Sequence, residues 1–223
     1  MSSFTINYNS LCAVRTHSAD NDTRYYLNGV CFMPAKKLVA ATDGHRLFVA
    51  NALQDIDPAC ADFILDNASV DAILSAHKTT KKYNMAIEFT FSDGTVSVVT
   101  PIGTLQFKPV EGKFPDISRV IPDSTSIPTA FEAGHYNWRY LHEADLALDI
   151  FTDSVKSKSR KNTVGSRAIV QRGRDSALMT ASVTYNDSVL SALIVIMPTR
   201  AEAEAVYNTA LDDLRAINSC FTA

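Results

Sequence analysis

The hydrophobic pattern of residues 1–122 predicts short strands interrupted by two helices. Apolar residues form runs at hairpin spacing, separated by turn residues. Helices are expected at 9–17, where Leu11 and Val14 share a face, and from residue 67 onward, where Val70 and Ile73 recur at a helical interval. Strands are expected at 3–7, 25–33, 38–42, 47–53, 62–65, 85–91, 95–99 and 104–110. The pattern is typical of an antiparallel sheet with packed helices.

The same order of elements begins again after a proline-containing stretch at 122–128. We therefore predict a domain of residues 1–122 and a shorter second domain of residues 123–223. Thr199 and Glu202 form a capping box ahead of a C-terminal helix. The other elements expected in the second domain are a helix at 135–151 and strands at 127–133, 166–172, 177–185 and 189–197. The recurrence indicates an internal duplication, and the overall class is α+β.

Composition fits an ordinary globular protein, with 46% hydrophobic and 20% charged residues among 223. The sequence has no apolar stretch of the roughly 18 residues that a spanning helix needs, and the start, MSSFTINYNS, does not have the pattern of a signal peptide. We expect a cytoplasmic protein. The cysteines are far apart and predict reduced core thiols rather than disulfides or a metal site, so neither a metal nor another cofactor is expected. These cysteines are Cys12, Cys31, Cys60 and Cys220.

Catalytic motifs are absent from the sequence. It contains no glycine-rich phosphate loop, no G-x-S-x-G and no H-E-x-x-H. His45 near Asp43 is the best candidate for a hydrolase, because a carboxylate can orient an imidazole as a general base. A turn of Asp43 and Gly44 between two strands explains the same residues without any chemistry. We therefore expect a protein that is not an enzyme.

Charge is unevenly distributed along the chain. The formal net charge is −3, so the molecule as a whole should not attract nucleic acid. Residues 156–174 nevertheless contain seven basic residues and no acid. This segment is either a surface that faces phosphates or a solvated basic loop, and charge alone does not decide between them.

Three motifs carry a resemblance to a known family. They are RYYLNG at 24–29, ATDGHRL at 41–47, and GKFPD at 112–116 followed by RVIP at 119–122. In this order and spacing they resemble the bacterial replicative sliding clamp, the beta subunit of the DNA polymerase III holoenzyme. The resemblance covers residues 3–122 well and the remainder weakly. It matches the family's middle domain and the exit into its third domain, and the family's first domain has no counterpart in the sequence.

The resemblance implies a DNA-clamp fold and a processivity factor. In that family, domains of like fold form a ring around duplex DNA, with helices inside and sheets outside. A hydrophobic pocket between the middle and third domains takes the short peptide motif of polymerases, clamp loaders and repair proteins. The alternative is that Leu27, Leu47 and Val120 are simply core residues. Carried over by motif, the pocket would use Leu27, Thr42, Gly44, His45, Arg46, Leu47, Pro115, Arg119 and Val120.

The segment Val195–Arg200 looks like the Met-Pro-x-Arg signature that completes this pocket in the family. In one interpretation the second domain is shortened internally, so that Val195, Met197, Pro198 and Arg200 complete the pocket and the terminal helix is an addition. In the other, 189–197 corresponds to the strand before a domain's second helix, and the closing strands are absent. The capping box at Thr199 favours the second interpretation and the signature favours the first.

DNA contact, if the resemblance holds, should be electrostatic and independent of sequence, with non-specific double-stranded DNA as the partner. Acidic residues on the third predicted helix, Glu143, Asp145 and Asp149, oppose such contact there. The candidate residues are Arg15, Lys78, Lys81, Lys82, Arg139, Lys156, Lys158, Arg160 and Lys161.

The sequence thus predicts a compact, two-domain sliding-clamp relative of the kind that a phage or mobile element encodes. A ring of about six domains needs three copies of a two-domain chain, so a head-to-tail trimer is the symmetric solution. The alternative function is a non-encircling clamp mimic or regulator that binds replication proteins through the peptide pocket.

Overall fold

The computed structural model describes residues 2–57, 60–78, 85–121, 136–152, 169–171, 176–185 and 188–198. The helices within them are α1 (Tyr8–Arg15), α2 (Asn67–Lys78) and α3 (Trp138–Phe151), with short 3-10 turns η1 (Tyr25–Leu27), η2 (Pro34–Lys36) and η3 (Ile117–Arg119). The strands are β1 (Ser2–Asn7), β2 (Gly29–Met33), β3 (Leu38–Thr42), β4 (Arg46–Ala50), β5 (Leu53–Gln54), β6 (Phe63–Asp66), β7 (Ala86–Ser92), β8 (Thr95–Thr100), β9 (Gly103–Phe107), β10 (Ile169–Gln171), β11 (Ala177–Tyr185) and β12 (Ser188–Ile196).

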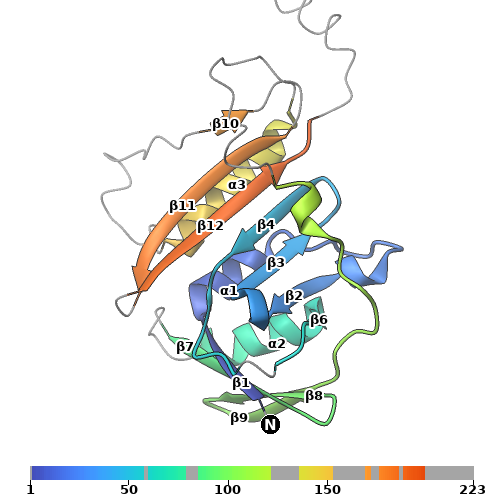
Figure 1. The fold of residues 1–223 in the computed structure, drawn as a ribbon, viewed down its shortest axis with the longest axis vertical. Helices are drawn as coiled ribbons and strands as arrows, with labels where there is room; N and C mark the ends of the chain where they lie inside the picture. The colour runs from blue at the N-terminus through green and yellow to red at the C-terminus, as the bar shows by residue number, and fades with distance from the viewer. Residues whose placement is uncertain are drawn as a thin grey trace, which may run out of the picture.

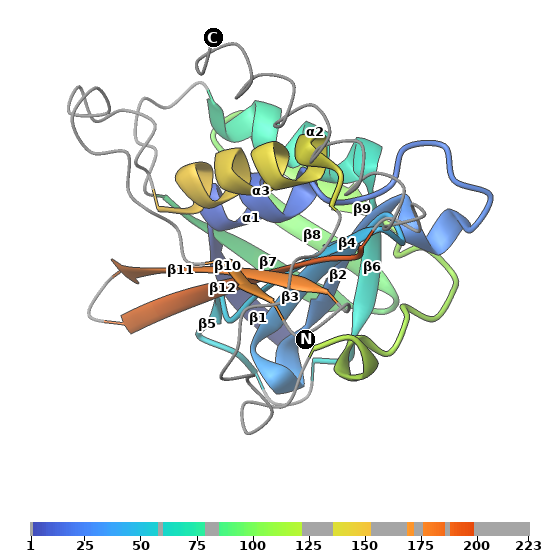
Figure 2. The same cartoon turned by 90° about the horizontal axis from the view of Figure 1, so that it is seen from above.

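The strands form two antiparallel sheets (Figure 1). One sheet has the order β5-β1-β7-β8-β9, and the other has the order β10-β11-β12-β4-β3-β2-β6. Figure 2 shows α1, α2 and α3 lying together on one side of the strands. This arrangement is the predicted α+β class.

The larger sheet continues from the first predicted domain into the second. β12 pairs with β4, so that Val195 lies opposite Leu47 and Ile196 opposite Arg46. The main core is also shared, since Leu148 of α3 packs in the same cluster as β1 and β4 residues. The expected boundary at 122–128, the strand at 127–133 and the helix from 199 lie outside the described residues. The division into two domains therefore stays a prediction.

Both faces of the larger sheet are buried near its centre. Successive side chains of a strand point to opposite faces, so Phe48 and Ala50 of β4 join the main core whereas Leu47 and Val49 join a second cluster. This is why the strands are continuous apolar runs and not alternating ones. Residues 108–121, which we call the covering segment, supply Val110, Phe114, Ile117 and Val120 to the second cluster.

The main core contains a group of phenylalanine rings between the two sheets. Phe4 of β1 stacks on Phe89 of β7, with ring centroids 5.0 Å apart. Phe32 of β2 stacks on Phe63 of β6 at the same distance. Phe4 also lies 5.7 Å from Phe32, which joins the two stacks. Aromatic pairs of this kind each add about 0.5–1.5 kcal/mol beyond their area burial.

Three predicted strands differ from the structure. The strand expected at 104–110 ends at Phe107. Residues 25–27 form the 3-10 turn η1, because the Leu27 amide bonds to the Arg24 carbonyl, and β2 begins at Gly29. The predicted strand at 47–53 is divided at Asn51, whose backbone and side chain bond to Ser191 of β12. The chain then leaves the larger sheet, and β5 pairs with β1 in the smaller one.

His17 is a buried histidine that follows α1. Its ring meets Phe48 edge-on with centroids 5.3 Å apart, and Nδ1 lies 2.9 Å from Thr16 Oγ1. Within the described residues, Nε2 has no hydrogen-bond partner. Burial, reinforced by the charge of Arg46, lowers the pKa of His17 to about 3. The imidazole is therefore neutral in the folded protein at neutral pH.

His17 should make stability depend on pH. An unfolded histidine has a pKa of about 6.5, so between about pH 6.5 and 3 the unfolded state binds a proton that the folded state excludes. The free energy of unfolding should fall with decreasing pH by up to about 1.4 kcal/mol per unit. Urea unfolding of wild type and His17→Gln between about pH 8 and 4.5 tests this. The variant should differ from wild type by a constant above about pH 7 and have a smaller slope below it, where only carboxylates such as Asp22 and Asp116 still contribute. Equal slopes in variant and wild type would contradict the assignment.

Candidate functional site

A cavity of about 190 Å³ lies where β3 and β4 meet η1, the covering segment and the end of β12. Four parts of the sequence build it: η1 with Arg24, the turn at 42–47, the covering segment, and β12 with Met197. Its floor is apolar, because Leu27, Leu47 and Val195 are all buried. Ile117 and Val120 of the covering segment form one wall. The arrangement can hold an apolar side chain out of water while leaving one side open.

The turn between β3 and β4 is fixed by its own side chains. Thr42 Oγ1 donates to the Arg46 carbonyl at 2.8 Å and accepts from the Gly44 amide at 3.1 Å. Asp43 Oδ1 accepts from the amides of His45 and Arg46, both at 2.9 Å. These bonds satisfy the turn's backbone donors and hold it rigid.

Gly44 suits this turn because of its backbone conformation, and it also leaves room for a neighbouring side chain. Its φ of +88° is a conformation that other residues adopt at a cost. A Cβ atom there would also lie 2.8 Å from Arg24 Nη2. The absence of a side chain lets the Arg24 guanidinium lie against the turn at the rim of the cavity.

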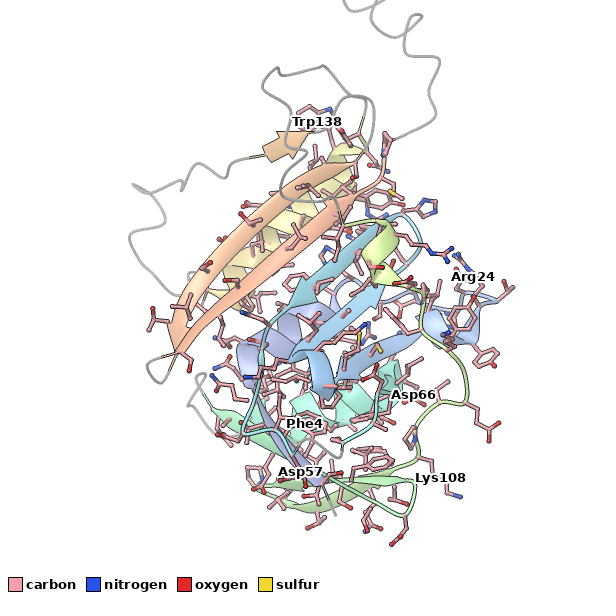
Figure 3. All side chains as sticks on the ribbon, viewed as in Figure 1. Phe4, Arg24, Asp57, Asp66, Lys108 and Trp138 are labelled. Carbon is pink, nitrogen blue, oxygen red and sulfur yellow. The ribbon has the colours of Figure 1, made fainter. Side chains whose placement is uncertain are left out.

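Arg24 is a half-exposed cation at this rim. Its Nη2 donates to Asp22 Oδ2 at 2.7 Å and its Nε to Oδ1 at 3.0 Å. The hydrogen bonds from Arg24 lower the pKa of Asp22 to about 2. Figure 3 shows Arg24 at the surface near the covering segment. The charge is thus held in place yet remains accessible.

Arg46 connects the turn to α3. Its Nε donates to Asp43 Oδ2 at 2.9 Å, and its Nη1 donates to Glu143. Arg46 also lies 5.1 Å above the Tyr140 ring, on which His45 stacks. Partial burial raises the pKa of Glu143, but the hydrogen bond from Arg139 and the charge of Arg46 outweigh it and hold that pKa below its usual range. The polar side of the cavity therefore depends on the packing of α3.

Most of the pocket residues expected from the sequence line this one cavity. They are Leu27, Thr42, Gly44, His45, Arg46, Leu47, Pro115, Val120, Val195 and Met197. Arg119 does not line it, because the side chain is 83% exposed beside Asp116 on the outside of η3. Pro198 does not line the cavity either, because the lining ends at Met197. Arg200 is outside the described residues.

Sequence reasoning missed Arg24, Asp116 and Ile117, which also line the cavity. Arg24 and Asp116 stand inside the motifs that carry the resemblance, so the motifs themselves were the available signal. Ile117 is the apolar residue next to Asp116, and it is the buried first residue of η3.

The placement of Val195 and Met197 agrees with the interpretation in which this strand completes the pocket. The Met197 amide donates to the His45 carbonyl at 2.8 Å, which ties the end of β12 to the turn. The capping box at Thr199, on which the other interpretation rests, lies outside the described residues.

Asp43 and His45 each have other partners at this turn. The Asp43 carboxylate accepts from two backbone amides and from Arg46, and the His45 ring stacks on Tyr140 with centroids 5.9 Å apart. The geometry is that of a structural turn, as the non-catalytic interpretation predicts.

Two candidate DNA contacts are engaged in ion pairs. Both Nε and Nη2 of Arg15 donate to the Asp71 carboxylate at 3.0 Å, which ties α1 to α2. Arg139 Nε donates to Glu143 Oε1 at 2.7 Å. Lys78 is exposed at the end of α2. The other candidates, Lys81, Lys82, Lys156, Lys158, Arg160 and Lys161, lie outside the described residues.

The cysteines that the structure describes are free thiols. Cys12, Cys31 and Cys60 form no disulfide, and burial raises the pKa of each. Cys220 is outside the described residues.

Within the described ranges, the side chains of His, Cys, Asp and Glu form no group of three that could hold a metal ion. The helices of the described part are too short or too polar to cross a membrane.

Comparison with known proteins finds sliding clamps, which the motifs also resemble. No family model matches the sequence. The beta sliding clamp of Rickettsia felis is 34% identical over 109 residues, and that of Rickettsia bellii is 32% identical over 111; each match covers 48% of this chain and 29% of the relative. The DNA polymerase III subunit beta of Pseudomonas aeruginosa aligns over 90% of this chain and 67% of that chain, with a TM-score of 0.61 at 18% identity. The fold is that of the bacterial sliding clamp.

A second solved clamp gives the same result. The subunit beta of Borrelia burgdorferi covers 89% of this chain with a TM-score of 0.62 at 15% identity. The resemblance to sliding clamps and the clamp fold are thus confirmed. The chain spans less than a third of the length of the curated relatives it matches by sequence, and about two thirds of the solved clamp chain from Pseudomonas.

The Arg46–Glu143 pair of this clamp fold should contribute measurably to stability. Glu143→Gln removes the charge facing a guanidinium that is 11% exposed, while Asp43 keeps its own contact. We expect a loss of about 1–2 kcal/mol in the free energy of unfolding, measured in urea. The exposed Glu88→Gln on β7 is the matched control and should change stability by less than about 0.5 kcal/mol.

A double-mutant cycle separates this pair from its surroundings. Combined with Arg46→Met, Glu143→Gln should lose most of its effect, with a coupling energy of at least about 0.5 kcal/mol. Additive losses would show that the two side chains do not depend on each other.

Proposed function

We propose that the chain is a sliding-clamp-like processivity factor. In this proposal an oligomer encircles duplex DNA, and the cavity docks short peptide segments of polymerases, clamp loaders and other replication proteins. The observation that carries the proposal is the convergence of three separate sequence motifs on one accessible apolar cavity. Side chains needed only for the core would fill that space themselves.

The chemistry of the cavity suits a peptide anchor. Its apolar floor of Leu27, Leu47 and Val195 would bury a leucine or aromatic side chain, which gives most of the binding free energy at such sites. Arg24 and His45 at the rim supply polar groups that would fix the peptide's orientation. A rigid turn supports the proposal further, because a preorganised site loses little entropy on binding.

Ring assembly is supported by the unpaired edges of the sheets. In the described part of the chain, β9 is an edge strand, and the residues Gly103, Thr104 and Gln106 along it are exposed. An edge strand presents backbone donors and acceptors that a second copy can extend. Contact between two different edges is heterologous and closes into a ring if the rotation allows, which for this chain we propose at three copies.

Peptide docking should depend on the floor of the cavity. Leu47→Ala should weaken binding of a fluorescent peptide with a Leu-Phe anchor by about 1–3 kcal/mol, roughly 5- to 150-fold, measured by anisotropy. Leu47 is also buried in the second cluster, so Met197→Ala, at a side chain 38% exposed, provides a variant that should fold normally. Leu146→Ala on α3, outside the cavity lining and 36% exposed, is the matched control. Unchanged affinity in both cavity variants would remove the cavity as the docking site.

Encirclement of DNA should be visible in the mass of the oligomer and in its retention on circular DNA. Size-exclusion chromatography with light scattering should give a mass near three chains. The oligomer should remain on circular DNA and leave linear DNA by its ends, with retention that weakens as salt rises. A monomer that binds the peptide but is not retained on circular DNA would instead support the non-encircling regulator.

A further inference from the structure

A second groove lies beside the cavity, on the other side of the covering segment. Its volume is about 460 Å³, and it is bounded by β2, η2, the start of β6 and residues 112–117. Pro115, Asp116 and Ile117 line both the groove and the cavity. The two hollows are therefore separated by one short stretch of chain, and a peptide bound in the first would have to cross this stretch to reach the second.

The groove has a different chemistry from the cavity. Its floor is apolar, formed by Cys31, Met33 and Ile64 of the second cluster. Burial raises the pKa of the Cys31 thiol to about 12, so this floor carries no charge. The ammonium groups of Lys36 and Lys113 stand at its edge, both exposed.

The groove has fewer carboxylates without other partners than it has lysines. Asp116 already accepts hydrogen bonds from the amide and hydroxyl of Ser118, and its other oxygen lies 3.5 Å from Arg119 Nε. The hydrogen bonds from Ser118, with the charges of Arg119 and Lys36, hold the pKa of Asp116 below its usual range. Asp62 is the remaining acid of the lining. Within the described residues, neither Lys36 nor Lys113 has an ion pair, so two cations face one carboxylate that is not already bonded.

We propose that this groove binds the acidic residues that flank the apolar anchor of a docking peptide. The inference rests on the proposed function, because the anchor in the cavity is what delivers the flank. Carboxylates of the flank would lie at Lys36 and Lys113 while its aliphatic carbons cover Met33 and Ile64. The closeness of the groove to the cavity, across the short stretch that lines both, selects a segment of the same peptide as the occupant, and the unpaired lysines of the groove select acidic residues. Such contacts add specificity and association rate more than affinity.

Three labelled peptides test the proposal by fluorescence anisotropy. The first carries the Leu-Phe anchor alone, the second adds three glutamates through a Gly-Ser spacer, and the third replaces these with glutamines. Each extension is made at the N-terminal and at the C-terminal end of the anchor, because the orientation of the bound peptide decides which flank reaches the groove. The glutamate peptide should bind about fivefold more tightly than the glutamine peptide at low salt, and this gain should shrink in about 0.5 M NaCl.

Charge reversal at the groove identifies the site. In Lys36→Glu combined with Lys113→Glu, the glutamate peptide should lose its advantage, whereas the anchor peptide should bind as it does to wild type. The matched control is Lys37→Glu combined with Lys108→Glu, which makes the same change in net charge at two exposed lysines outside the groove lining. This control should keep most of the advantage.

The outcomes separate the two proposals. If the anchor peptide binds and glutamates give no gain over glutamines, the groove proposal fails and peptide docking stands. If both double variants lose the gain equally, the effect is one of net charge and the groove is again excluded. If the anchor peptide does not bind at all, the proposed function fails and the groove proposal fails with it.

Discussion

The pairing of β12 with β4 is the contact on which the candidate site depends. It places Val195 opposite Leu47, and the Met197 amide then closes on the His45 carbonyl. These residues are far apart in the sequence, so their meeting requires α3, β11 and β12 to fold against the first part of the chain. Arg46 and Glu143 fasten the same junction from the helix side. Without β12 the cavity would lack part of its floor, whatever the conformation of the turn.

The hollows follow from how the outer face of the larger sheet is covered. A sheet with apolar residues on both faces must have both faces covered, and the helices cover one of them. The covering segment is one extended stretch of polypeptide with the short turn η3. It is too narrow to cover the whole of the other face of the sheet. The cavity lies on one side of it and the second groove on the other. The two hollows thus arise from incomplete cover of this face by the covering segment.

Local patterns in the sequence predicted most elements and most of the cavity. β3 and β11 match their expected bounds, because runs such as 38–42 are bounded by turn residues on either side. The turn at Asp43 and Gly44 was visible because its chemistry is local. The link from Arg46 to Glu143 was not, since no local periodicity relates an arginine on one strand to a carboxylate on a distant helix. The η1 turn was missed for a related reason: Tyr25 and Tyr26 favour strands, and the bonds between Asn28 and Asp22 override that preference.

Charge placement bears on how a clamp of this kind would hold DNA. The net charge of −3 opposes attraction, and two of the cations on the helix layer, Arg15 and Arg139, are engaged by Asp71 and Glu143. Arg15 is bonded through two nitrogens to its carboxylate and presents little free charge to a phosphate, whereas Arg139 is bonded through Nε and its side chain is 78% exposed. Among the described residues, this layer therefore offers phosphates the exposed Lys78 of α2 and the exposed part of Arg139. Under the proposed function, topological closure of a ring would retain it on DNA without tight binding, and weak attraction would let the ring slide.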